Sequence, residues 1–188
     1  MRTEIQEKTA MFHAVNDITL RGEIVVFGST FMANFPFYEL SQKYMMTNAV
    51  YNRSIEGLTL AEAEEILQEC VLEIKPGKVF LALGEKDIGS PSAMAVYSRI
   101  LRKLKEKLPE AKLYILPVQK DEFSQNDGGR VAFNEKLKEL SIRYGVTWLD
   151  VPDQPLSLNV LYEKIFKKLN CFFRGNHISF ANAFSYAD

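Results

Sequence analysis

The sequence predicts an α/β fold of three layers, in which a five-stranded parallel sheet lies between helices. Two observations predict it. Short β-rich runs alternate with longer segments of helical period, the pattern typical of parallel sheets with crossover helices. Polar, glycine-containing motifs directly follow three of these runs. We expect strands near residues 23–28, 48–52, 78–83, 112–117 and 146–150.

The segment between the second and third strands carries the strongest helical pattern. Apolar side chains recur there at helical spacing, and glutamates occupy the other face. Thr59 and Glu62 have the spacing of a capping box, and Pro76 with Gly77 ends the pattern. We therefore expect one continuous helix here, with its apolar side at positions 60, 63, 66, 67, 70, 71 and 74.

Three more helices are expected further along the chain. Ser90 and Pro91 would begin the first, as cap and first-turn proline, with an inward face of Tyr97, Ile100, Leu101 and Leu104. The others are expected near 130–143, ended by Gly145, and near 158–169. The polar stretch 119–130 is expected to be a mobile loop over one end of the sheet. The first twenty residues are expected to be irregular.

Length and composition fit one globular domain, over 23–188, preceded by an extension over 1–22. The chain has 188 residues, 47% of them hydrophobic, and a formal net charge of -1. That charge gives no indication of nucleic acid or an anionic membrane as partner. The basic residues between 99 and 107 fit the solvated face of a helix.

No run is long enough to cross a bilayer and no leader pattern is seen, so we expect a cytoplasmic protein. The oligomeric state stays open.

Cysteine and histidine are too few and too scattered for a metal site. Cys70 and Cys171 lie far apart, as do His13 and His177. Cys70 falls in line with apolar helical positions and is expected to be a buried structural thiol. We expect neither a metal nor another cofactor.

Four short motifs occur in a fixed order. They are Gly28-Ser29-Thr30, the segment from Asn52 to Gly57, the segment from Gly84 to Asp87, and Gly175-Asn176-His177. The first three follow expected strands, whose carboxyl ends form the binding crevice of open α/β sheets. Over residues 23–183, this order resembles the SGNH (GDSL-like) hydrolase family. The resemblance implies a flavodoxin-like architecture and hydrolysis of an ester or acyl group of a small substrate.

The resemblance places Thr30 at the position of the family's serine nucleophile and Ser29 at that of the neighbouring aspartate. A threonine hydroxyl can attack an acyl carbon when a base is adjacent, although its methyl group restricts the approach. Ser29 would serve only if the turn were shifted in register. In the competing interpretation, both hydroxyls cap the following turn by hydrogen bonds to backbone N–H groups.

The oxyanion-stabilising groups implied by the resemblance are the N–H of Thr30, the N–H of Gly57 and the residue at position 86. The family has an asparagine there, within a Gly-x-Asn-Asp motif, whereas this chain has Lys86 between Gly84 and Asp87. Loss of one aligned donor costs about 100- to 1000-fold in rate. The competing interpretations are a plain turn glycine at position 57 and a solvated cluster of charges around Lys86.

His177 is the catalytic base that the resemblance implies. The family orients this imidazole with an aspartate three positions earlier, where this chain has Arg174. A guanidinium cannot accept the ring N–H, and it disfavours the imidazolium that a base must become. Asp150 or Asp153 would then be the orienting carboxylate. The competing role for His177 is a structural hydrogen bond.

Three functions follow, in descending order. The first is an esterase-like hydrolase that uses Thr30 and His177. The second is a non-catalytic protein of the same scaffold that binds an acyl, sugar or anionic ligand. The third is a flavodoxin-like flavin carrier, based on the turn at Gly28, but the side chains of Phe31 and Met32 hinder close approach of backbone N–H groups to a phosphate.

Overall fold

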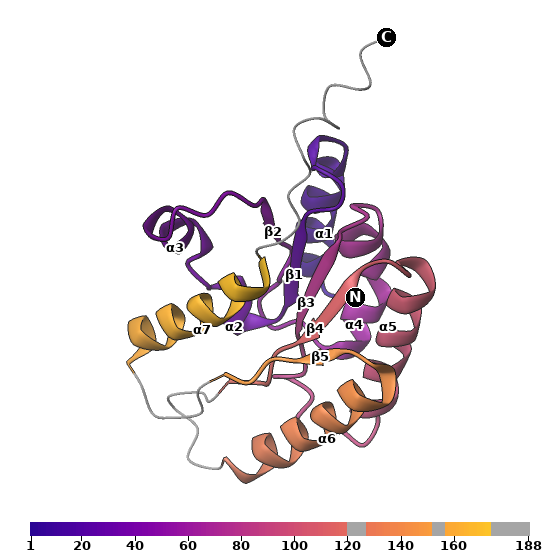
Figure 1. Ribbon diagram of the computed structural model, residues 1–188. Coiled ribbons are helices and arrows are strands. Elements are labelled where there is room, and N and C mark those ends of the chain that lie inside the picture. Colours follow the sequence, from indigo (N-terminus) through magenta and orange to yellow (C-terminus); the bar gives the residue numbers. More distant parts are fainter. Residues whose placement is uncertain (120–126, 152–156, 174–188) are drawn as a thin grey trace.

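The structure is a computed structural model that describes residues 1–119, 127–151 and 157–173. Five parallel strands form one sheet in the order β2-β1-β3-β4-β5 (Figure 1). The α/β class and all five expected strands are thereby confirmed. The strands are β1 Ile24–Gly28, β2 Val50–Asn52, β3 Lys78–Ala82, β4 Lys112–Ile115 and β5 Thr147–Trp148.

Helices cover both faces of the sheet, which gives the three expected layers (Figure 1). One face packs against the helical segments α1 Thr3–Ala14, α4 Leu60–Glu65, η2 Gln68–Leu72, α5 Ala93–Lys107 and α6 Gly128–Tyr144. The other face packs against α2 Thr30–Ala33, α3 Phe37–Lys43 and α7 Leu158–Phe173. A short 3-10 turn, η1 Asn16–Ile18, follows α1.

The central strands are buried on both sides, as an unbroken apolar sequence predicts for a covered parallel sheet. Val25 and Phe27 of β1 face the first layer, whereas Ile24 and Val26 face the second. Each of the four is fully buried. Helix α5 inserts the four apolar side chains predicted for its inner face, and Gly145 ends α6 in a left-handed conformation, as expected.

Four expectations about the helices and the loop between them were wrong. The first twenty residues contain the twelve-residue helix α1 and are not irregular. The helix expected over 60–74 leaves α-geometry at Ile66 and continues as the π-helical segment η2. Helix α5 begins at Ala93 with Ser92 at its N-cap, two residues beyond the start expected from Ser90 and Pro91. Gly128 and Arg130 belong to α6, so the polar stretch before α6 is shorter than expected.

The capping box at the start of α4 is confirmed. The Thr59 side chain accepts a hydrogen bond from the Glu62 backbone N–H, and the Glu62 carboxylate accepts one from the Thr59 N–H at 3.1 Å. Such a cap satisfies backbone donors that the helix itself leaves without partners.

Thr59→Ala is expected to lower the free energy of unfolding by about 1 kcal/mol, because the helix start loses its side-chain acceptor. Urea denaturation followed by circular dichroism measures the change. Ser98→Ala is the matched control, since the Ser98 hydroxyl only donates to the Met94 carbonyl in mid-helix. A midpoint for Thr59→Ala equal to that of the control would contradict the prediction.

Candidate active site

The candidate site lies where the strand order changes direction. The chain leaves β1 toward β2 on one side and later places β3 on the other side. The loops that leave β1 and β3 therefore diverge, and the crevice of such a sheet forms at their carboxyl ends. Gly28 faces Ala82 across these two strand ends. A side chain at Gly28 would meet the Ala82 carbonyl at 2.8 Å, so the two loops start in close contact.

Thr30 and Ser29 differ in their access to solvent. Ser29 is fully buried, and its hydroxyl has no hydrogen-bond partner among the described residues. It makes no side-chain cap for α2. Thr30 is half-buried, and its hydroxyl accepts a hydrogen bond from the Gly57 N–H at 3.0 Å. Of the two adjacent hydroxyls, that of Thr30 is therefore the one within reach of a ligand.

The structure brings together Thr30 and Gly57, the residues for which the resemblance implies the roles of nucleophile and backbone donor. Gly57 has φ of +68°, a conformation that glycine adopts at little cost. Asn52 fixes the start of the same loop, because its amide donates to the Met32 carbonyl at 2.8 Å and accepts from the Ser54 N–H at 3.1 Å.

Glu85 is the site residue that the sequence did not identify. The Phe31 N–H donates to both carboxylate oxygens, at 3.2 and 3.3 Å. Burial raises the pKa of Glu85, while the Phe31 N–H, the charge of Lys86 and the polar groups of Thr30 act in the opposite direction. The available signal was its position in the motif that follows β3.

The other predicted binding residues of this loop make different contacts. Lys86 is exposed. Asp87 accepts a hydrogen bond from the Leu60 N–H at 3.0 Å and so joins its loop to the start of α4. Gly84 is buried against the Phe133 ring and has φ of +107°, which indicates a packing role. Among the described residues, the donor at the Thr30 hydroxyl is the Gly57 N–H, and no hydrogen bond joins Lys86 to this hydroxyl.

His177 and Asp153 lie outside the described residues. The preceding helix α7 ends with Phe173, and the Lys78 ammonium donates to the Phe172 and Phe173 carbonyls at 2.6 and 3.1 Å. Lys78 begins β3, whereas Thr30 follows the opposite end of the neighbouring strand. Helix α7 therefore ends beside the amino-terminal end of β3, whereas Thr30 lies at the carboxyl end of β1.

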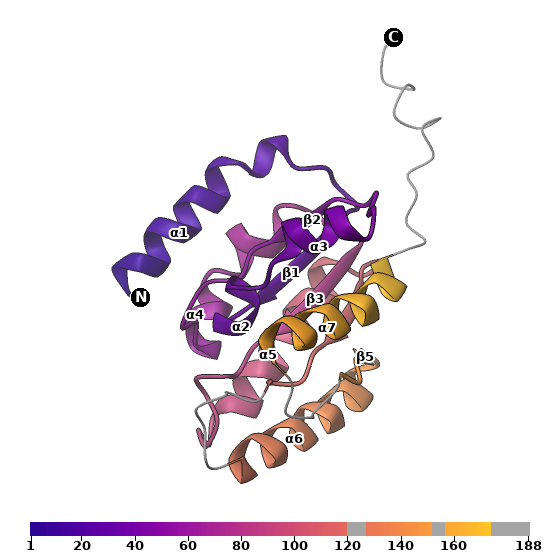
Figure 2. The ribbon, with the colours of Figure 1, turned by 90° about the vertical axis from the view of Figure 1, so that its left-hand side faces the viewer.

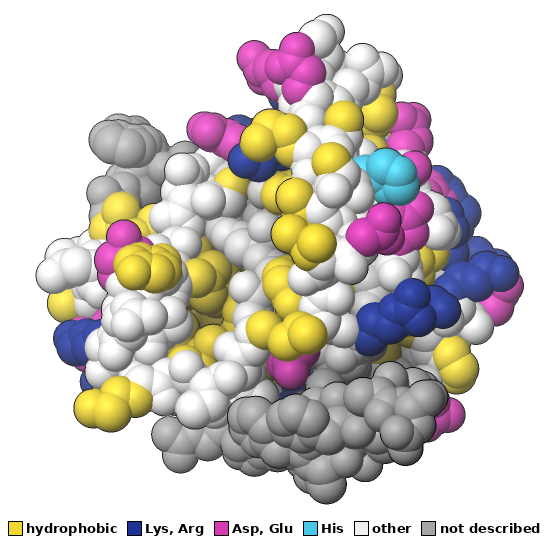
Figure 3. All heavy atoms as spheres, turned by 90° about the horizontal axis from the view of Figure 1, so that it is seen from above, with side chains coloured by type: hydrophobic (Ala, Val, Ile, Leu, Met, Phe, Trp, Pro, Cys, Tyr) yellow, Lys and Arg dark blue, Asp and Glu magenta, His cyan; other side chains and the backbone are white. Residues whose placement is uncertain are grey.

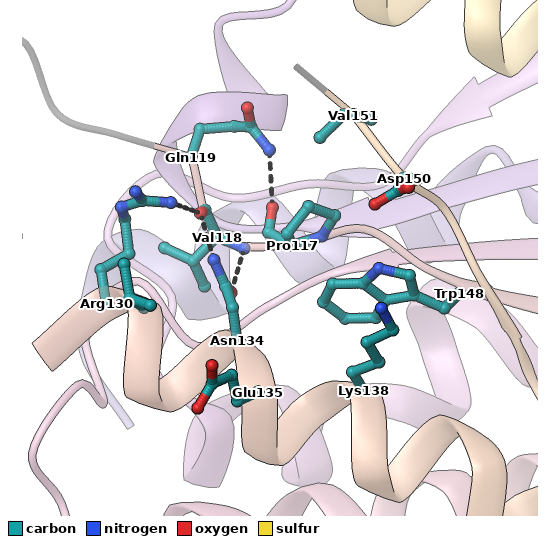
Figure 4. Close-up of a pocket in the computed structure, with 11 residues that line it drawn as sticks. Pro117, Val118, Gln119, Arg130, Asn134, Glu135, Lys138, Trp148, Asp150 and Val151 are labelled. Atoms are coloured by element: carbon teal, nitrogen blue, oxygen red, sulfur yellow. Dashed lines mark hydrogen bonds between the residues drawn. The ribbon is translucent and has the colours of Figure 1, made fainter. Parts of the chain in front are cut away.

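A cavity of about 190 Å³ opens at the carboxyl ends of β4 and β5, beside α6 (Figure 4). Lys138, Trp148 and Asp150 line one part of this cavity. Asn134 is already bonded to the Val118 backbone through both ends of its amide. Asp150, the other predicted orienting carboxylate, thus lines this cavity, whereas Thr30 does not.

Helix α1 lies on the outside of the molecule (Figure 2), and residues at its ends contact the loop that contains Gly57. Arg2, just before the helix, donates to the Gly57 carbonyl and forms a two-point ion pair with Glu62 at 2.9 and 3.0 Å. The Arg53 guanidinium, from the same loop, donates to the Phe12 carbonyl at 3.0 Å. No role for this extension could be predicted from the sequence, and in the structure its contacts fix the loop that carries the Gly57 N–H.

Arg2→Met is expected to raise the pKa of Glu62, which the hydrogen bond from Arg2 lowers to about 2, toward its ordinary value of 4.5. The carboxylate loses the partner that favours its ionised form. In the wild type, the stability from this pair is present above about pH 4.5 and is lost as the pH falls toward 2. A carboxyl NMR titration measures the change. Arg99→Met, which removes the equivalent pair with Glu64, is the control and leaves the Glu62 titration unchanged.

His13, the histidine within the part of the chain that the structure describes, is not part of the site. His13 lies at the end of α1, and its ring is hydrogen-bonded to the Glu73 carboxylate at 2.7 Å, at a surface where acidic side chains adjoin it (Figure 3). Within residues 1–119, 127–151 and 157–173, no group of three histidine, cysteine or acidic residues has the arrangement of a metal site. No helix in that part of the chain is long and apolar enough to span a membrane.

No protein-family model and no curated protein matches the sequence, but solved structures match the fold. A Streptococcus pneumonia protein named as a platelet activating factor aligns with a TM-score of 0.76 at 18% identity, over 90% of this chain and 92% of that chain. A GDSL-like lipase from Bacteroides thetaiotaomicron aligns with a TM-score of 0.65 at 12% identity, over 87% and 97%.

The psychrotrophic esterase EstA from Pseudoalteromonas sp. was solved inhibited by monoethylphosphonate. It aligns with a TM-score of 0.63 at 13% identity, over 82% of this chain and 100% of that chain. These alignments span nearly the whole domain. At such identities they show a common fold and leave the chemistry to be argued from the residues.

Proposed function

Because the chain has the fold of the SGNH (GDSL-like) hydrolases, we propose that it hydrolyses an ester or acyl group of a small substrate, with Thr30 as nucleophile. The observation that supports this most is the position of the Thr30 hydroxyl. Thr30 follows the carboxyl end of β1 and is half-buried, and its hydroxyl oxygen accepts a hydrogen bond from the Gly57 N–H at 3.0 Å. A donor aimed at this oxygen stabilises negative charge on it when the proton leaves.

The proposed reaction is slow. The asparagine of the family motif is replaced by an exposed lysine, and loss of one such donor costs about 100- to 1000-fold. The Phe31 N–H, next to Thr30, already donates to the Glu85 carboxylate and is not open to a substrate oxygen in this state. The Gly57 N–H, at 3.0 Å, is the backbone donor that the structure shows at the Thr30 oxygen.

The substrate is proposed to be a small acyl ester. The solved structures similar in fold include a lipase and an esterase, which supports an acyl ester as the class to test.

Hydrolysis of short acyl esters by the purified chain tests the proposal. Slow turnover that disappears in Thr30→Ala supports it. His177→Ala, assayed beside it, shows whether the histidine predicted from the sequence takes part. Turnover unchanged in Thr30→Ala would mean that this mechanism is wrong.

One observation favours a second candidate, a non-catalytic protein that binds an acyl or sugar ligand in the same crevice. The Glu85 carboxylate already accepts the Phe31 N–H at the start of α2, as a bound anion would. For the same reason an anionic ligand, including a flavin phosphate, is disfavoured at this turn. A ligand that raises the melting temperature, combined with absence of Thr30-dependent turnover, would support this candidate.

A further inference from the structure

The loop after β2 is held by the sheet at its start but not at Gly57. The Ile55 N–H donates to the Gly28 carbonyl at 3.1 Å and so continues the pairing of the chain with β1. Beyond it, the Leu58 N–H closes a turn on the Ile55 carbonyl at 3.3 Å. Gly57 lies inside this turn, and its N–H donates to the Thr30 hydroxyl. The direction of this N–H therefore depends on contacts from outside the sheet.

Arg2 supplies such contacts through a ring of hydrogen bonds. Its guanidinium donates to the Gly57 carbonyl and to both oxygens of the Glu62 carboxylate. The same carboxylate accepts the N–H and the hydroxyl of Thr59, at 3.1 and 2.8 Å. The turn at Gly57 and the start of α4 are thereby joined to one side chain.

The guanidinium also lies directly against Gly57. A β-carbon added to this glycine would be 3.3 Å from Nη1 and 3.7 Å from Nη2 of Arg2. Glycine rotates more freely about φ than any other residue, so a functional N–H on glycine needs support from its surroundings. Because Arg2 holds the Gly57 carbonyl and covers the α-carbon, it restricts rotation about the φ bond that joins the N–H to them.

These contacts are stronger than those of an ordinary surface ion pair. An exposed pair with one contact contributes little to stability, whereas a two-point pair of arginine and carboxylate is stronger and fixes geometry. The Glu62 side chain is 14% exposed, so the pair is partly shielded from solvent. The contact with Gly57 thus belongs to an anchored guanidinium.

A second contact fixes the other end of α1. The Arg53 guanidinium donates to the Phe12 carbonyl at 3.0 Å and lies 4.8 Å from the centroid of the Phe12 ring. Arg53 is 3% exposed, so this contact is buried. Helix α1 is therefore joined to the loop at Arg53 and, through Arg2, at Gly57. A rigid helix held at both ends limits the movement of the loop between these two residues.

We propose that Arg2 is a positioning residue, which keeps the Gly57 N–H directed at the Thr30 oxygen during catalysis. This inference rests on the proposed function. Arg2 acts through the Gly57 backbone. A donor that is already in place when negative charge develops costs no reorganisation, whereas a loosened donor must be ordered in each turnover. The effect is therefore expected in kcat.

The first measurement is steady-state hydrolysis of para-nitrophenyl acetate by the wild type, Arg2→Met and Arg2→Lys. Arg2→Met is expected to lower kcat by about 10- to 100-fold with KM changed by less than about twofold, the cost of a misplaced donor. Arg2→Lys retains a cationic donor but not the two-point pair, and its kcat is expected to lie between the two. Arg99→Met, which removes the two-point pair with Glu64, is the control and keeps the wild-type kcat.

The second measurement is hydrogen exchange of single backbone amides by NMR, which needs no turnover. In Arg2→Met, the Gly57 amide is expected to exchange about 10-fold faster, because the turn opens more often. The Ile55 amide is the internal reference, since the Gly28 carbonyl holds it whether or not Arg2 is present. Its exchange is expected to stay unchanged.

The outcomes that overturn the inference are distinguishable. If turnover depends on Thr30 and Arg2→Met keeps the wild-type kcat, the proposed function stands and Arg2 has no positioning role. If kcat falls while the Gly57 and Ile55 amides accelerate equally, the variant is destabilised as a whole and the inference is wrong. If the wild type has no Thr30-dependent turnover, the proposed function fails and the role of Arg2 in catalysis fails with it.

Discussion

Thr30→Ala is expected to lower kcat/KM for a short acyl ester by at least about 1000-fold. The substitution removes the atom that forms the acyl intermediate, and the groups that act with it cannot replace it. The fold is expected to persist, since Thr30 is half-buried and lies at the start of a four-residue helix. Steady-state hydrolysis measures the effect.

Thr30→Ser is the matched variant. It keeps the hydroxyl and removes a methyl group that restricts rotation and approach. Activity is therefore expected to equal or exceed that of the wild type. If alanine and serine at position 30 give the same rate, the hydroxyl has no part in turnover.

Gly84→Ala is expected to have the largest effect on stability, a loss of about 2–4 kcal/mol. The new methyl carbon would lie 2.5 Å from the Phe133 ring, and φ of +107° is a conformation that side-chain-bearing residues rarely adopt. Overpacking and backbone strain each cost about 1–3 kcal/mol. Denaturant titration measures the loss.

Gly89→Ala separates the two contributions. Gly89 also has positive φ, at +86°, but nothing lies within 4 Å of its added carbon. Only the strain is expected there, about 1–2 kcal/mol. Equal losses at both positions would show that Phe133 does not restrict Gly84.

The sheet could be predicted because its signals are local. Each strand is a short apolar run with a polar motif after it, as between Val25 and Thr30, and burial on both faces requires such runs. Helix α1 gave no such signal. Its buried side is formed by Ile5 and Thr9, while Met11 on the same helix is exposed, so hydrophobicity did not mark the face that packs.

The candidate site could be predicted only in part. Glycine at 57 and hydroxyls at 29 and 30 identified two loops that do meet, because their positions at strand ends fix where they lie. Which hydroxyl is accessible depends on how the turn is oriented, and sequence does not reveal that. Glu85 was missed because a charged loop residue normally faces solvent, and its burial depends on the long-range contact with Phe31.

Covalent labelling tests the central claim most directly. The Pseudoalteromonas esterase with the same fold was inhibited by monoethylphosphonate, a reagent class that would react with an activated hydroxyl. Peptide mass spectrometry of the chain after treatment with an activated phosphonate is expected to place one adduct on Thr30, and Thr30→Ala is expected to remain unlabelled. Equal labelling of the wild type and Thr30→Ala, or no adduct at all, would contradict the account.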